Sequence, residues 1–225
     1  DLCSDLVGEY PELQGVMGKY FALAQGFEED VANSISDHYL PIGLTSVLPK
    51  KPYSYSISIV DKIDTLVGFF VIDEKPTSSK DPFALRRAAI GLLRIIIENK
   101  LSFKLRDLIS YAIRLYQEQG VEIKNEKTEQ QVLEFIKERM RNVLKLKNIK
   151  TDVIEASISS HAGDNFLALY AKTLLMNKYK NKGIGLNAIN SYKRASNILD
   201  KAGKRITGRP DAVLFRKDEE KILHE

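Results

Sequence analysis

Apolar residues recur every three or four positions along most of this chain, which is the spacing of one face of an α-helix. The segment 53–72 is typical, because Ile59, Ile63, Leu66, Val67 and Phe70 would lie on one side of a helix. Serine and isoleucine alternate over 56–59 as in a short strand, but the pattern that follows favours a helix. The periodicity predicts an all-α protein with helices at 28–39, 53–72, 82–99, 102–119, 128–146, 151–159, 165–180 and 189–204, and a short final one from Asp218.

The predicted helix 82–99 has the clearest start signal and the most apolar composition. Asp81 is expected to be its N-cap, with Pro82 at the first helical position, where a missing N–H has no cost. Apolar residues occur on most of its sides, which is typical of a helix at the centre of a bundle. The exceptions are Arg86, Arg87 and Arg94, and buried or half-buried arginines need partners.

Charge divides the chain into two unlike parts. The net charge of +4 combines residues 1–75, with five basic and twelve acidic residues, and residues 76–225, with 29 basic and 18 acidic residues. The first part therefore has a net charge of −7 and the second of +11. Such asymmetry suggests that the second part meets a polyanion. An ordinary lysine-rich solvated surface is the alternative, and charge alone does not decide between them.

The cellular compartment can be inferred from the cysteine content and from the lack of a signal peptide or membrane span in the sequence. A single cysteine, Cys3, excludes a disulfide framework and indicates a reducing compartment, so a cytoplasmic protein is expected. The chain starts at Asp1 rather than Met, already in helical spacing, and shows no signal peptide. No run of about 18 apolar residues indicates a membrane span. We therefore expect an internal piece of a longer protein.

Motifs that carry chemistry are few. The sequence has no glycine-rich phosphate loop, no G-x-S-x-G elbow, no H-E-x-x-H and no C-x-x-C. His38 attracts attention because Asp61 and Asp64 follow on the next predicted helix, and phosphohydrolases of the HD type bind metal through His and Asp from separate helices. One histidine is too few to hold such an ion, so no metal site is expected.

Basic residues provide the candidate binding site. Lys80, Arg86, Arg87 and Arg94 gather around one predicted helix N-terminus, which itself favours anions such as phosphate. Arg86 and Arg87 have a rival role, which is to pair with Asp81, Asp61 or Asp64 and hold helices together. Farther along the chain, Lys193 and Arg194 lie on another predicted helix, and three tyrosines offer rings for stacking on unpaired bases, unless they pack in the core: Tyr170, Tyr179 and Tyr192.

Four long segments occur in an order that resembles a known family. They are VGEYPELQGVMG (residues 7–18), HYLP (38–41), DKIDTLVG (61–68) and KPTSSKDPFALRRAA (75–89), followed by a weaker one, YKRASNIL (192–199). Together they closely resemble the β subunit of the bacterial tetrameric glycyl-tRNA synthetase. The resemblance spans essentially the whole chain and is strongest over residues 5–97.

The resemblance implies a domain plan and a function. It implies a degenerate HD-like helical domain (1–100), a helical body (101–190) and the start of an arginyl-type anticodon-binding domain (191–225). In the family, an α2β2 heterotetramer attaches glycine to tRNA(Gly); the α subunit uses ATP and Mg²⁺, and the β subunit binds tRNA. The chain alone is then expected to be non-catalytic and free of cofactors and metal, with partners that include neither DNA nor a membrane. His38 and Asp61 become non-functional remnants of metal-ligand positions.

Two other functions stay open at this point. One is an HD-type phosphohydrolase whose metal site is completed by residues upstream of the chain. The other is a structural module that docks the α subunit without binding tRNA.

Overall fold

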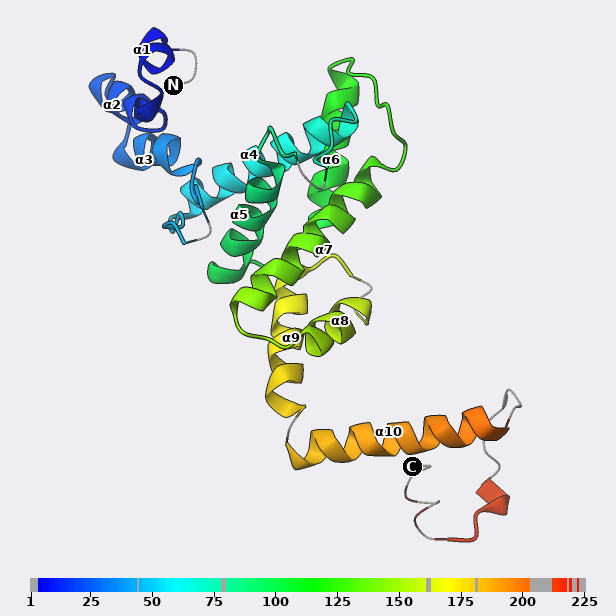
Figure 1. Cartoon of the computed structure of the whole chain (residues 1–225). Helices are drawn as coiled ribbons and strands as arrows, with labels where there is room; N and C mark the ends of the chain where they lie inside the picture. The colour runs from blue at the N-terminus through cyan, green and yellow to red at the C-terminus, as the bar shows by residue number, and fades with distance from the viewer. Residues whose placement is uncertain are drawn as a thin grey trace. The chain divides into compact units, whose positions relative to one another are not determined.

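The computed structural model describes residues 4–43, 45–77, 80–160, 163–180, 182–202, 212–217, 219 and 222. Within these residues the protein is all-helical, as predicted, and has no strand (Figure 1). The α-helices are α1 (Asp5–Glu9), α2 (Met17–Ala24), α3 (Glu29–Asp37), α4 (Pro52–Val71), α5 (Leu85–Glu98), α6 (Leu105–Glu118), α7 (Thr128–Leu146), α8 (Thr151–Ser159), α9 (Phe166–Tyr179) and α10 (Gly183–Ala202). Two 3-10 helices, η1 (Pro11–Leu13) and η2 (Ala212–Leu214), complete the described elements.

Most helix limits agree with the sequence pattern. The helices α3, α4, α6, α7, α8 and α9 lie within about three residues of the predicted limits. The predicted start of α10 at Ile189 is wrong, because the helix begins at Gly183. Its predicted end at Lys204, and most of the short helix expected from Asp218, fall outside the described residues.

The chain divides into two compact units, Asp1–Asn177 and Lys178–Glu225. The first unit contains α1 to α8 and nearly all of α9, and the second contains α10 and η2. These compact units do not test the family domains predicted at 1–100, 101–190 and 191–225, which stay predictions. In the described part of the chain, no helix is both long and apolar enough to cross a membrane.

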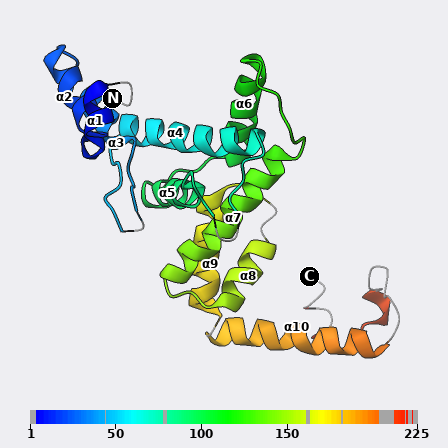
Figure 2. The same cartoon turned by 45° about the horizontal axis from the view of Figure 1, so that its top comes forward.

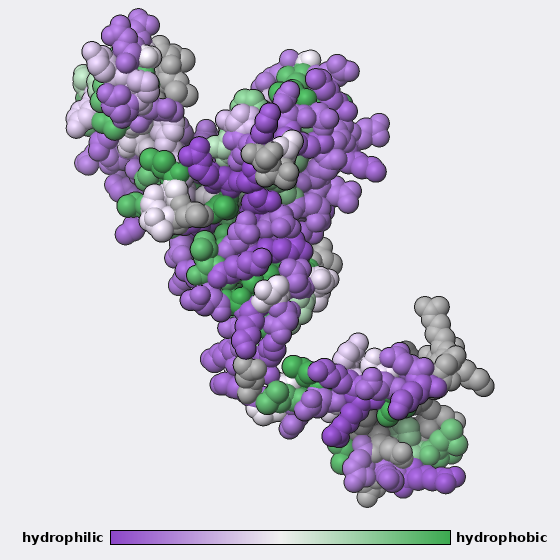
Figure 3. Space-filling view, in the orientation of Figure 1, coloured by the Kyte–Doolittle hydropathy of each residue, from purple (hydrophilic) through white to green (hydrophobic). Residues whose placement is uncertain are grey.

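The core of the first unit is built around α5. In Figures 1 and 2, α4, α5 and α7 lie together, and each of the three packs against the other two. One contiguous apolar cluster joins them with α6, α8 and α9, and its fully buried members include Leu66 on α4, Leu92 and Leu93 on α5, and Ile136 and Met140 on α7. The prediction that the helix after Asp81 lies at the centre of a bundle is confirmed. The outer surface is mainly hydrophilic, as Figure 3 shows for one face.

A sharp turn places the start of α5 later than predicted. The helix begins at Leu85 rather than Pro82, because Ala84 has a left-handed backbone, with φ of 55°. Asp81 nevertheless performs the expected task, since its carboxylate oxygens accept the backbone N–H groups of Leu85 at 2.8 Å and Arg86 at 3.0 Å. The carboxylate thus satisfies two of the N–H groups that open the helix.

Replacing Asp81 by alanine is expected to lower the free energy of unfolding by about 1–2 kcal/mol, because two helix N–H groups lose their acceptor. Urea denaturation at neutral pH measures the change. Asp107→Ala is the matched control, since Asp107 is an exposed acid in the first turn of α6 that caps no described N–H group. Equal losses in the two variants would contradict the capping role.

Candidate functional site

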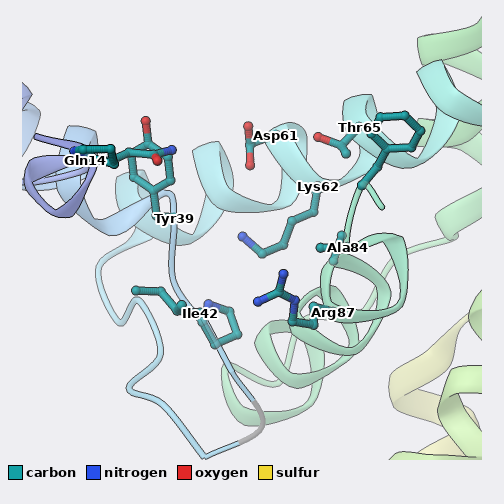
Figure 4. Close-up of a pocket in the computed structure, with 12 residues that line it drawn as sticks. Gln14, Tyr39, Ile42, Asp61, Lys62, Thr65, Ala84 and Arg87 are labelled. Atoms are coloured by element: carbon teal, nitrogen blue, oxygen red, sulfur yellow. The ribbon is translucent and has the colours of Figure 1, made fainter. Parts of the chain in front are cut away.

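A pocket of about 570 Å³ opens between α4, α5 and the segments that precede them (Figure 4). We call it the α4–α5 pocket, and the residues that give it its character are Gln14, Tyr39, Asp61, Lys62, Phe83 and Arg87. Figure 4 shows the amino group of Lys62 and the guanidinium of Arg87 in the middle of the pocket, with Tyr39 and Gln14 at one end. The pocket therefore brings together a cation from α4 and another from α5.

Lys62 is buried, with 5% of its surface exposed. Its ammonium donates hydrogen bonds to the backbone oxygen of His38 at 3.1 Å and to Ser58 Oγ at 2.9 Å. Burial lowers the pKa of Lys62 from 10.5 to about 8, and the neighbouring charge of Asp61 opposes this shift. An ammonium has three donors, so the two described partners leave one donor for the pocket.

Gly91 on α5 makes room for this lysine. A Cβ atom at position 91 would lie 3.1 Å from Lys62 Cε and 3.2 Å from Pro41 Cγ. Both distances are tighter than an ordinary van der Waals contact. The missing side chain therefore allows α4 and α5 to enclose Lys62.

Arg86 and Arg87 have different surroundings although they are adjacent. Arg86 lies 3.9 Å from Asp81 Oδ2 and donates to the backbone oxygen of Thr77. Arg87 is exposed, and its guanidinium forms no hydrogen bond or ion pair with any described residue. The alternative of a structural ion pair is thus supported for Arg86 with Asp81, whereas Arg87 is available to a ligand.

Arg94 binds the chain that precedes α4. Its guanidinium donates to the backbone oxygens of Gly43 at 2.7 Å and Ser46 at 2.9 Å. This is a structural role that the sequence did not reveal. That Arg94 also contacts tRNA stays a prediction.

The remaining predicted basic residues lie on the surface. Lys80 is exposed before the start of α5, and the described residues offer its ammonium no partner. Lys193 and Arg194 are exposed on α10 and are likewise unpartnered in the described part of the chain. They belong to the second compact unit, whereas Lys80 and the arginines of α5 belong to the first.

The three tyrosines considered for base stacking differ in exposure. Tyr170 packs against the apolar core, which agrees with the alternative that it is a packing residue. Tyr179 is half exposed, and the ammonium groups of Lys178 and Lys182 lie over its ring. Tyr192 on α10 is 74% exposed and offers an open ring.

His38 and Asp61 do come together. Both line a second hollow, of about 420 Å³, together with Asp64. His38 Nδ1 lies 2.6 Å from the backbone oxygen of Ile35, and its ring is 4.0 Å from that of Tyr39. Within the described residues no group of three or more His, Cys, Asp or Glu side chains has the arrangement of a metal site.

The burial of two cationic side chains was not predicted. Lys62 lies three residues after Ile59 and four before Leu66, so its place on the apolar face of α4 was a readable signal. Arg139 on α7 lies with its guanidinium 4.9 Å from the centre of the Phe135 ring, and no described residue forms a hydrogen bond with its buried Nε. Burial lowers the pKa of Arg139, and nearby Arg86 adds to this effect.

Comparison with known proteins identifies the family, which the geometry alone does not. A family model described as "Glycyl-tRNA synthetase beta subunit" matches residues 1–159. The chain belongs to this family. Proteins named glycine–tRNA ligase beta subunit are similar to this chain. The one from Rickettsia canadensis is 41% identical over 99% of this chain, and the one from Paracoccus denitrificans is 36% identical over 99%. The one from a Ruegeria species is 38% identical over 91% of this chain. The chain covers 32%, 28% and 32% of these relatives, or about a third of their length.

This family member should depend on Arg94 for stability but not on Arg87. Arg94→Ala is expected to lower the free energy of unfolding by about 2 kcal/mol, because two backbone oxygens lose a charged donor. Arg87→Ala, on the same helix, should change it by less than about 0.5 kcal/mol. Urea denaturation of the two variants tests this, and a larger loss for Arg87→Ala would refute the assignment.

Lys62 should make stability rise with pH in the alkaline range. Its pKa is lower in the folded chain, about 8, than the ordinary 10.5, so the unfolded chain binds more protons between these values. The free energy of unfolding of the wild type, relative to Lys62→Met, should therefore rise by about 3 kcal/mol from pH 8 to 10.5.

Urea denaturation at several pH values measures this difference. Lys50→Met controls for the loss of a lysine, because Lys50 is exposed and no described residue pairs with it. Parallel pH profiles for the wild type and Lys62→Met would show that Lys62 is not buried as the structure has it.

Proposed function

We propose that this chain is the tRNA-binding part of the β subunit of a glycine–tRNA ligase. Family membership is the observation that supports it, because relatives that match almost the whole chain are named glycine–tRNA ligase beta subunit. In this proposal the complete enzyme attaches glycine to tRNA(Gly) in an ATP-dependent reaction in the cytoplasm. The chain contributes RNA binding and positioning rather than bond chemistry.

The name "beta subunit" implies an α subunit as partner. We place adenylate formation, with its ATP and Mg²⁺, on that α subunit, within an α2β2 heterotetramer. The proposal also retains the HD-like character of residues 1–100 and the anticodon-binding character of residues 191–225.

Unpartnered cations support the RNA-binding role. Lys80, Arg87, Lys193 and Arg194 are exposed, and their side chains form no ion pair or hydrogen bond with any described residue. Contacts of lysine and arginine with phosphates displace counterions from the nucleic acid, and this release drives much of the binding. Tyr192, one residue before Lys193, adds an exposed ring on which an unpaired base can stack.

The double variant Lys193→Ala/Arg194→Ala is expected to weaken binding of tRNA(Gly) and to make it less sensitive to salt. If both side chains contact phosphates, the slope of log affinity against log salt concentration should fall by about two. Filter binding between about 50 and 200 mM salt measures the slope.

The variant Lys50→Ala/Arg114→Ala removes the same charge from exposed positions elsewhere and serves as the control. Its salt slope should equal that of the wild type. If both double variants reduce the slope equally, the effect is one of net charge, and the assignment of Lys193 and Arg194 fails.

A further inference from the structure

The α4–α5 pocket contains hydrogen-bond donors that the fold does not use. Lys62 directs two of its three donors to His38 O and Ser58 Oγ. Arg87 carries five N–H donors, none of them bonded to a described residue. Both groups lie in the middle of the pocket in Figure 4. Such donors are the ones that recognise phosphate oxygens.

The charge of the pocket favours an anion. Lys62 and Arg87 are cationic, and Asp61 is the one acidic side chain among the described residues that line it. The lining thus has a net charge of +1 when these three groups are ionised. Because Lys62 is withdrawn from water, an anion near its ammonium is attracted more strongly than at an exposed lysine.

Size and aromatic walls indicate what else the ligand carries. A volume of about 570 Å³ lies in the range of small-molecule sites. Phe83 lines the pocket and is 43% exposed, while its ring stacks on Phe69 at 3.9 Å between ring centres. A ring that is held on one side and open on the other is a suitable surface for a nucleobase.

We propose that the α4–α5 pocket binds the phosphate of a nucleotide, held by Lys62 and Arg87, with the base against Phe83. This goes beyond the proposed function, which counts Arg87 among the exposed RNA-binding cations but assigns no ligand to this pocket and no role to Lys62. Free nucleotides and a nucleotide of an RNA chain share this chemistry, and the experiment separates them.

Isothermal titration calorimetry of the 225-residue chain with AMP, adenosine and inorganic phosphate at constant ionic strength tests the site. AMP should bind at least about tenfold more tightly than adenosine, because the phosphate meets two cationic donors. Equal affinity for AMP and adenosine, or no binding of AMP, would overturn the proposal.

Two substitutions should act in opposite directions. Arg87→Ala should weaken AMP binding about fivefold or more, and Asp61→Asn should tighten it about twofold to fivefold by removing a like charge. Both residues are exposed, so neither change disturbs the core. Arg114→Ala, an exposed arginine on α6, should leave the affinity unchanged. Weakening by both pocket variants, or by neither, would refute the assignment.

A single-stranded oligoribonucleotide with hydroxyl groups at both ends identifies the source. Displacement of AMP by this RNA supports the site and assigns its phosphate to an RNA chain. Failure to displace AMP supports the site and assigns it to a free nucleotide. Because tRNA binding is tested at Lys193 and Arg194, failure of that proposal and failure of this one are distinguishable.

Discussion

The burial of α5 against α4 and α7 is the constraint on which the first unit depends. Leu85, Ala89, Leu92, Leu93 and Ile95 are fully buried, so α5 has almost no side that faces only water. A helix so enclosed cannot shift or rotate without opening the apolar cluster around it. Its position therefore fixes where its three arginines emerge.

The three arginines of α5 differ in their partners. Arg94, deep along α5, is half-buried and binds two backbone oxygens of the 43–46 segment. Arg86 binds the polar segment before the helix, where it pairs with Asp81 and donates a hydrogen bond to the Thr77 carbonyl. Arg87 alone of the three faces the α4–α5 pocket without a described partner. One helix thus supplies two structural arginines and one that is available to a ligand.

The sequence predicted the fold better than the site. Helical spacing located α4 and α7 almost to the residue, because long amphipathic helices repeat their pattern over several turns. The late start of α5 was not predictable, since Asp81 and Pro82 look like an N-cap and first helical residue, and only the left-handed backbone of Ala84 separates them from the helix.

The roles of the basic residues were least accessible to sequence. Residue type makes Arg86, Arg87 and Arg94 equivalent. Yet Arg86 binds the Thr77 carbonyl, and Arg94 binds backbone oxygens of Gly43 and Ser46, up to 51 residues away in the chain. The side chain of Arg87 has no partner among the described residues. Long-range packing decides such partners, and no local spacing encodes it. Lys62 is different, because its position among apolar residues of α4 is a local signal from which its burial could have been predicted.

The net charge of a region does not determine the charge of a pocket within it. Residues 1–75 have a net charge of −7, and on that ground the polyanion was expected to meet the later part of the chain. The α4–α5 pocket is lined by one cation from each region: Lys62 belongs to the acidic region and Arg87 to the basic one. Asp61 is the one acidic residue of that region that lines the pocket among the described residues. Exposed charges that lie farther from the pocket than a Debye length, about 8–10 Å, are largely screened by salt. The buried ammonium beside an unpartnered guanidinium therefore determines the local preference, and the regional sum does not.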